Sequence, residues 1–208
     1  VAKKPSMDDL TIHDGVLSSN NPAVRLDFGA YAKGVAVKRA IAILRNYGIE
    51  NAIANAGGDL QAIGHYQTGN ESRPWRIGIR HPRKHDQVLA SITLKPGEAV
   101  FTSGDYERYY EYHGKRYHHI LDPATGYPAR GVRSVTVIHT NPALADAAST
   151  ALFVAGVDDW QNVAHAMGLR YVMLVDSQGV AHLTAPMHKR LQFEIEPSPT
   201  SKVSHDNW

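Results

Sequence analysis

Hydrophobic residues alternate with polar residues or glycine in several segments along the chain. The segments 75–82 (WRIGIRHP) and 90–97 (ASITLKPG) both follow this spacing, which is the period of a strand with one buried face. The segments 51–64 and 108–120 each contain two such runs around a turn, at a glycine pair and at His113-Gly114. These patterns predict two hairpins, a further strand over 133–140 and a closing hairpin over 170–183.

Helical spacing is found in three segments. Val37, Ile41 and Leu44 share one face of a helix predicted over 35–47, with Gly48 as the stop. A second helix is predicted over 142–156, ending at Gly156, and a third over 158–168. Several consecutive strands with few helices indicate an α+β fold with a mixed or antiparallel sheet, and not a doubly wound parallel sheet.

The same patterns divide the chain into three parts. We expect a lead-in over 1–24, one domain over 25–193 and a polar C-terminal tail over 194–208. The tail (EIEPSPTSKVSHDNW) is rich in proline and serine, so we expect it to be loosely ordered or a linker.

Composition excludes several classes of function. The chain has 208 residues, 43% of them hydrophobic, and a formal net charge of only +2, which argues against nucleic acid as a partner. No apolar run approaches the length of a membrane-spanning helix. There is no cysteine, which excludes thiol catalysis, disulfides and thiolate metal sites. GxSxG, Walker A, GxGxxG and HExxH motifs are also absent.

Two glycine-rich clusters could contact a ligand. In LDFGAYAKG (26–34), Asp27 and Lys33 precede a helix, and the amides at a helix start together with a lysine attract phosphate. In NAGGDLQAIG (55–64), Gly57 and Gly58 could lie against a cofactor. Taken alone, a strand-to-helix turn explains the first cluster better, and a hairpin turn explains the second at least as well.

Two further clusters carry hydroxyl groups. In FTSGDYE (101–107), Thr102, Ser103 and the amide of Gly104 could bind a phosphate or a ring edge, or could simply end a strand. In DAAST (146–150), Asp146 and Thr150 are four residues apart and therefore share one helix face. Two oxygen donors suit Mg²⁺, although an isolated pair of this kind is more often a local helix feature.

The segment YHHILDPATGYP (117–128) places His119 and Asp122 on one loop. Histidine can accept a proton from a hydroxyl at neutral pH. If the strand continues to this point, His118 points to the opposite side. The alternative is a hairpin edge with exposed polar groups.

In this order the five clusters resemble the ApbE family of flavin transferases, from about Arg25 to about Val180. The resemblance implies an ApbE-like fold and a reaction in which FAD, with Mg²⁺, gives its FMN half to a threonine or serine of an acceptor protein and releases AMP. Acceptors in the family include subunits of the sodium-pumping quinone reductase and related electron-transfer complexes. Two alternatives are a non-catalytic flavin- or nucleotide-binding module and a Mg²⁺-dependent FAD pyrophosphatase.

The resemblance also assigns roles to single residues. His119 is implied as the general base, and Asp122, Pro123 and Gly126 are implied to shape the loop and fix the imidazole. The residues implied at FAD are Asp27, Lys33, Gly57, Gly58, Thr102, Ser103, Gly104 and Ile120. The residues implied at the metal are Ala30, through its carbonyl, Asp146, Ser149 and Thr150.

Two expectations concern the remainder of the protein. Family members have a longer N-terminal portion that helps to hold adenine and flavin, and we expect no counterpart of it in the 24 residues before Arg25. The family also implies the bacterial periplasm or cell envelope, with the cytoplasm as the alternative.

Overall fold

A seven-stranded sheet forms the centre of the protein in a computed structural model, which describes residues 4–204. The strand order is β16-β14-β13-β12-β9-β4-β3, and every pair is antiparallel except β14 with β16. The mostly antiparallel sheet confirms the predicted α+β class. The strands are β3 (Ala52–Ala56), β4 (Asp59–Ile63), β9 (Ala99–Gly104), β12 (Val132–His139), β13 (Tyr171–Asp176), β14 (Ala181–Thr184) and β16 (Ser201–Ser204).

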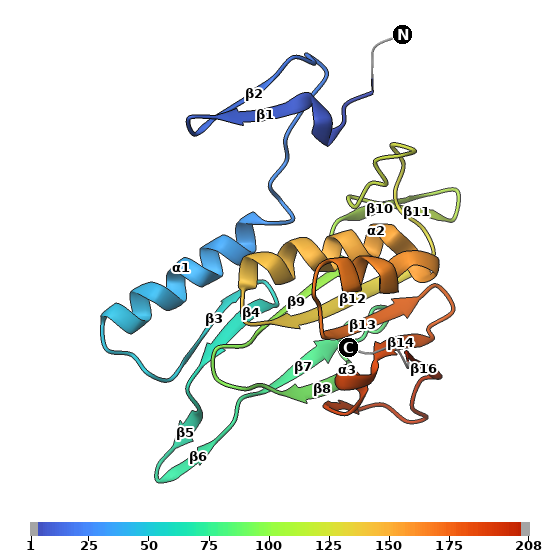
Figure 1. Ribbon diagram of the computed structural model, residues 1–208. Helices are drawn as coiled ribbons and strands as arrows, with labels where there is room; N and C mark the ends of the chain where they lie inside the picture. Colours follow the sequence, from blue (N-terminus) through green and yellow to red (C-terminus); the bar gives the residue numbers. More distant parts are fainter. Residues whose placement is uncertain (1–3, 205–208) are drawn as a thin grey trace.

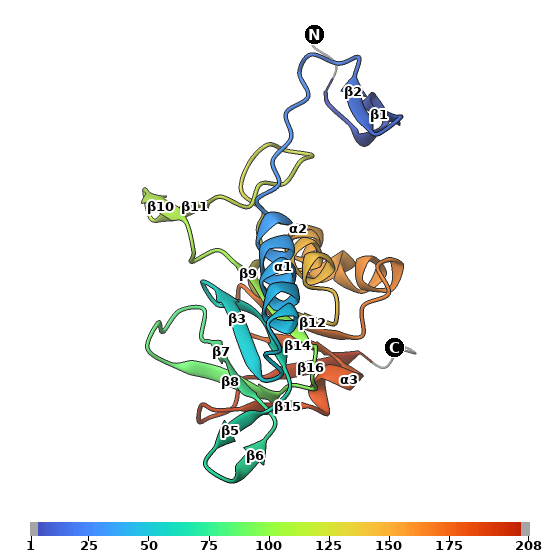
Figure 2. The same ribbon diagram turned by 90° about the vertical axis from the view of Figure 1, so that its left-hand side faces the viewer.

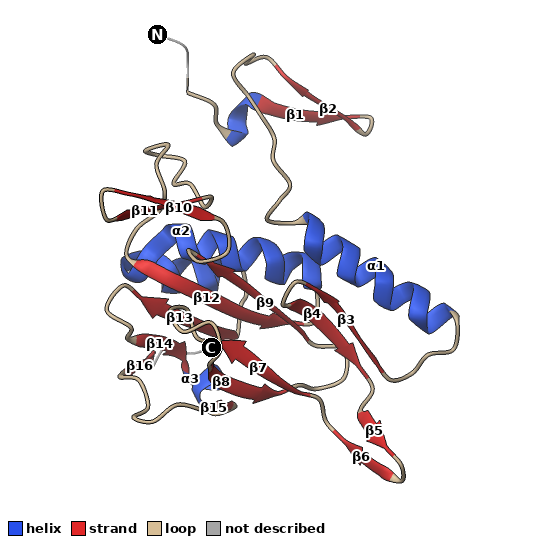
Figure 3. Cartoon of the chain, turned by 180° about the vertical axis from the view of Figure 1, so that it is seen from behind, coloured by secondary structure: helices blue, strands red, loops and turns tan. Residues whose placement is uncertain are grey.

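Both faces of this sheet are covered. Helices α1 (Ala32–Asn46) and α2 (Pro142–Ala166) lie on one face, as Figures 1 and 3 show. The other face packs against a smaller sheet of β15 (Leu191–Phe193), β8 (Val88–Thr93) and β7 (Arg76–Arg80), with α3 (Ala185–His188) beside it. In β12, Val135 and Val137 face the helices and Ile138 faces the smaller sheet, so the central strands carry hydrophobic residues on both sides.

The two helices predicted over 142–168 form one long element with a break. Gly156 has a φ of 72° and a ψ of −175°, which interrupts α2 at the residue where the first helix was predicted to end. Glycine adopts this conformation without the steric cost that a Cβ would add. The predicted boundary between the two helices is thus a kink within α2.

Three hairpins extend from this body. Hairpin β10 (Tyr109–Tyr112)–β11 (Lys115–His118) turns at His113 and Gly114, which both have positive φ, as a type I′ turn requires. The hairpin β5 (Tyr66–Thr68)–β6 (Glu71–Arg73) was not predicted. A third, β1 (Leu10–His13)–β2 (Val16–Ser19), follows the short helix η1 (Met7–Asp9) within the expected lead-in and lies apart from the sheet (Figure 2).

The expectation of a loosely ordered tail is wrong for residues 201–204. These residues form β16, which pairs in parallel with β14 at one edge of the central sheet. Residues 205–208 lie outside the described residues. The domain limits at 25 and 193 stay predictions. None of the helices within 4–204 is sufficiently long and apolar to span a membrane.

Candidate functional site

The first turn of α1 touches the first turn of α2 at a glycine. A Cβ added to Gly34 would lie 2.5 Å from the carbonyl oxygen of Pro142 and 2.6 Å from the Cα of Ala143. At this short separation the N–H of Gly34 donates a 2.8 Å hydrogen bond to Oδ2 of Asp146. The carboxylate of Asp146 therefore binds an amide at the N-terminus of α1, where the helix dipole favours negative charge.

A second carboxylate joins three elements beside this contact. Asp59, the first residue of β4, forms an ion pair with the ammonium group of Lys33 through Oδ2. Its Oδ1 accepts a 2.8 Å hydrogen bond from the N–H of Thr102 in β9. Sequence reasoning missed Asp59 as a site residue because the Gly-Gly-Asp segment was interpreted as a turn. An aspartate directly after two glycines, at the start of an alternating segment, was the available signal, and the structure shows that it is buried.

Three hydroxyl groups meet between β9 and α2. Oγ of Ser103 lies 2.8 Å from Oγ of Ser149 and 2.8 Å from Oγ1 of Thr150. The hydroxyl of Thr102 points elsewhere and bonds Thr136 of the adjacent strand at 2.9 Å. The structure thus joins Ser103, predicted at the cofactor, to Ser149 and Thr150, predicted at the metal, and directs the side chain of Thr102 into the sheet.

The donor set around Asp146 fits a hard cation. Asp146 is 3% exposed, and its burial raises the pKa of the carboxyl group, against the opposing effect of the Gly34 amide. No three acidic, histidine or cysteine side chains gather as a metal site within residues 4–204. A cation here would therefore be held by one carboxylate, by the hydroxyls of Ser149 and Thr150, and by a backbone carbonyl such as that of Ala30. Such an all-oxygen set matches Mg²⁺, which keeps several waters and one or two carboxylates.

A small hollow of about 120 Å³ opens beside the Lys33–Asp59 pair. Gly57, Gly58 and Thr102 line it with that pair, so four residues predicted to contact a cofactor converge with Asp59. No neighbouring atom lies within 4 Å of a Cβ built on either glycine, so a ligand can approach the backbone at this turn.

The remaining predicted cofactor residues have other surroundings. Asp27 accepts a 2.6 Å hydrogen bond from the N–H of Gly29 and shapes the exposed turn before α1. Gly104 ends β9, and a Cβ there would lie 2.4 Å from the ring of Tyr106. The side chain of Ile120 is 4% exposed and belongs to the hydrophobic core between α2 and the sheet. Their contacts with a flavin stay predictions.

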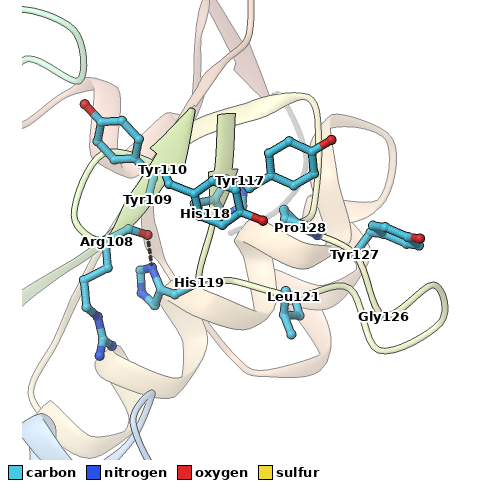
Figure 4. Close-up of a pocket in the computed structure, with 10 residues that line it drawn as sticks. All are labelled: Arg108, Tyr109, Tyr110, Tyr117, His118, His119, Leu121, Gly126, Tyr127 and Pro128. Atoms are coloured by element: carbon cyan, nitrogen blue, oxygen red, sulfur yellow. Dashed lines mark hydrogen bonds between the residues drawn. The ribbon is translucent and has the colours of Figure 1, made fainter. Parts of the chain in front are cut away.

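The predicted base, His119, lies at the wall of a larger hollow of about 610 Å³ (Figure 4). Nδ1 of His119 is 3.2 Å from the carbonyl oxygen of Arg108. Because a carbonyl can only accept, Nδ1 carries the proton and Nε2 keeps a free lone pair. Partial burial of the ring lowers its pKa below 6.5, against the effect of that carbonyl. The imidazole is therefore neutral at pH 7, as a general base must be.

His118 points the opposite way, as predicted. Its Nε2 lies 2.9 Å from the carbonyl oxygen of Ala129, and its ring contacts Phe153 of α2 edge to face, with 5.4 Å between the ring centroids. His118 is buried, whereas the side chain of His119 opens onto the hollow, where its ring is only partly shielded from solvent. The strand that ends at His118 thus anchors the loop to α2, one turn beyond Thr150.

Asp122 shapes its own loop. Oδ1 accepts a 2.8 Å hydrogen bond from the N–H of Ala124, and Oδ2 accepts one of 3.1 Å from the hydroxyl of Thr125. The expectation that Asp122 shapes this loop is confirmed. The expectation that it also fixes the imidazole is corrected, because Nδ1 of His119 bonds the carbonyl oxygen of Arg108. A catalytic role of Asp122 stays a prediction.

Comparisons with known proteins identify the family of the chain. The ApbE family model matches residues 1–173. A relative from Rhodobacter capsulatus named FAD:protein FMN transferase is 48% identical over 192 residues, covering 92% of this chain and 36% of the relative. A relative of the same name from Vibrio cholerae is 37% identical, covering 81% of this chain and 50% of the relative.

Two solved structures have the same fold. An ApbE protein from Thermotoga maritima superposes with a TM-score of 0.79 at 39% identity, covering 94% of this chain and 62% of that one. The flavinyl transferase ApbE of Pseudomonas stutzeri gives a TM-score of 0.73 at 32% identity, covering 90% and 57%. The chain spans half or less of the length of the curated relatives described above.

Proposed function

Because the chain belongs to the ApbE family, we propose that it carries the reaction centre of a Mg²⁺-dependent FAD:protein FMN transferase. The reaction would attach FMN through a phosphoester to a threonine or serine of an acceptor flavoprotein and release AMP. One observation carries this proposal. Asp146, held by the amide of Gly34, lies one helical turn from the hydroxyl cluster of Ser103 and Thr150.

These residues have distinct tasks in the proposal. Asp146, Ser149, Thr150 and the carbonyl of Ala30 would hold Mg²⁺, which when bound neutralises the charge that develops on the diphosphate. Lys33 lines the adjoining hollow, and its ion pair with Asp59 fixes its position there.

The proposed transfer balances atom by atom. Nε2 of His119 accepts the proton of the acceptor hydroxyl, and the oxygen of that hydroxyl forms a bond to the phosphorus of the FMN half. The bond from this phosphorus to the bridging oxygen breaks, and AMP leaves with that oxygen. The neutral imidazole at pH 7 and the free lone pair on Nε2 support this role of His119.

Incubation with FAD, Mg²⁺ and an acceptor tests the proposal. The acceptor would be a subunit of a sodium-pumping quinone reductase, the partner class that the family resemblance implies. We expect AMP release and a flavin-sized gain in acceptor mass, both lost in Asp146→Ala. The matched control is Asp158→Ala, an exposed aspartate on the same helix, which should retain both.

Two other outcomes would replace the proposal. AMP release without a gain in mass on any acceptor would indicate an FAD pyrophosphatase. Bound FAD with neither product would indicate a binding module.

A further inference from the structure

A tyrosine-lined groove lies between the β10–β11 hairpin and the loop that follows it. The 610 Å³ hollow with His119 at its wall adjoins a second hollow of about 190 Å³, and the two share Tyr117, Tyr127 and Pro128. Tyr109 and Tyr110 complete the aromatic lining (Figure 4). We call this continuous surface the tyrosine groove.

The charge along the tyrosine groove is entirely positive. Arg108 lines the first hollow, Lys115, Arg116 and Arg130 line the second, and neither hollow is lined by an aspartate or glutamate. Arg116 is neutralised, since it lies 3.0 Å from Glu111. Arg108, Lys115 and Arg130 have no ion-pair partner within residues 4–204. An occupant of the groove therefore meets three uncompensated cations.

The aromatic surface is already ordered. Tyr110 and Tyr117 face each other across the hairpin and stack with 5.2 Å between ring centroids and 7° between planes. The guanidinium of Arg116 lies 3.9 Å from the ring centroid of Tyr109, and the same arginine approaches Asp105 of the body at 3.7 Å. Ordered tyrosines lose little conformational entropy when they bind a partner.

The tyrosine groove also exposes apolar surface. Tyr110 is 64% exposed, Tyr127 is 63% exposed and Leu121 is 53% exposed. Exposed aromatic surface rimmed by polar groups is typical of protein-binding sites.

The position of His119 selects the occupant. The residues that converge as a cofactor site line the other hollow, beside Lys33 and Asp59, and none of them lines the tyrosine groove. His119 lines the tyrosine groove and not the hollow beside Lys33 and Asp59. A hydroxyl held in the groove therefore reaches the base without displacing a nucleotide from that hollow. That hydroxyl belongs to a protein, so the groove suits a polypeptide segment better than a second nucleotide.

We propose that the tyrosine groove docks the acceptor protein through an extended, acidic segment next to the hydroxyl that receives FMN. This inference rests on the proposed function, because the acceptor is defined by that reaction. Arg108, Lys115 and Arg130 would bind carboxylates of the segment, and the tyrosine rings would contact its apolar side chains.

Peptide binding tests the proposal without turnover. The probes are two fluorescein-labelled peptides with a central threonine and apolar residues, one carrying aspartates and the other lysines at the same positions. Fluorescence anisotropy is measured without FAD or metal, at low and high salt. We expect the acidic peptide to bind and the basic peptide not to bind, with weaker binding at high salt.

A matched pair of triple variants separates the groove from general charge. The groove variant combines Arg108→Gln, Lys115→Gln and Arg130→Gln. Its affinity for the acidic peptide should be about tenfold lower, since each exposed ionic contact contributes about two- to threefold in affinity. The control variant replaces three exposed cations elsewhere by glutamine, namely Lys38, Arg39 and Lys202. It should bind the acidic peptide as tightly as the parent does.

Several results would overturn the proposal. They are absence of binding by the acidic peptide, equal binding of both peptides, equal weakening in both triple variants, or displacement of the acidic peptide by AMP or FAD. Should the groove variant not fold, Tyr110→Ser replaces it with the same expected loss. Failure of the transferase reaction would leave peptide binding intact, so the two proposals fail separately.

Discussion

Replacing Gly34 by alanine tests whether the close approach of α1 and α2 forms the candidate site. The new Cβ would lie 2.5 Å from the carbonyl oxygen of Pro142 and 2.6 Å from the Cα of Ala143, which are both backbone atoms. Ordinary contact begins at 3.4 Å, so the helices would have to separate by about 0.9 Å (3.4 − 2.5). A separation of this size would weaken the 2.8 Å hydrogen bond from Gly34 to Asp146.

Two opposing terms set the magnitude. Overpacking costs about 1–3 kcal/mol, whereas alanine in place of glycine in a helix contributes about 0.8–1.0 kcal/mol of stability. We therefore expect Gly34→Ala to lower the free energy of unfolding by about 1 kcal/mol, within a range of about 0–2 kcal/mol. For a chain of this size the melting temperature would fall by about 2–4 °C, and by at most about 8 °C. The rate of AMP release should also fall under conditions in which the variant is fully folded, because the Asp146 carboxylate is displaced.

Urea unfolding and thermal melting, followed by circular dichroism, measure this difference. The control is Gly78→Ala, where the nearest atoms are the methyl groups of Val88 at 3.2 and 3.3 Å and can move. Gly78→Ala should change stability little. The idea that the close approach at Gly34 forms the site would be refuted if Gly34→Ala were as stable as the parent and released AMP at the full rate. The helix propensity of alanine would then outweigh the close contact.

Three further predictions concern the base and the hairpin that precedes it. The rate of flavin transfer should fall as the pH drops through a value below 6.5, because a lowered pKa keeps His119 neutral above that point; a pH–rate midpoint above 6.5 would contradict this. His119→Ala should lower the rate by about 10²–10⁴-fold, and a rate equal to that of the parent would remove His119 as the base. Asp105→Asn should lower the free energy of unfolding by about 2 kcal/mol in urea, because the carboxylate accepts bonds of 2.7 and 2.6 Å from Arg83 and lies near Arg116. The exposed Glu107→Gln is its control, and equal stability of the two variants would show that Asp105 does not anchor the hairpin.

Local patterns determined most of the secondary structure. The alternation in 51–64, 108–120 and 170–183 predicted hairpins that the structure contains, since a period of two follows from burying one face of a strand. His113-Gly114 predicted its own turn because both residues accept positive φ. The opposite orientations of His118 and His119 followed from the same period.

Elements with weak local patterns were missed. β16 lies in a polar segment rich in proline and serine, and it is ordered by pairing with β14. The β5–β6 hairpin has only three residues in each strand, which is too short for a periodic signal.

The sequence by itself determined which residue types were available for chemistry and the order in which they occur along the chain. Only the tertiary structure decided which of them meet. Lys33 and Asp59 are 26 residues apart, and Gly34 and Asp146 are 112 residues apart, yet both pairs are in contact. Asp59 became a site residue because β4 pairs with β9, and the imidazole of His119 is fixed by the carbonyl of Arg108 and not by Asp122. The physical reason is that periodicity records only whether a position is buried, whereas the contacts of a polar side chain depend on which strands and helices pack together.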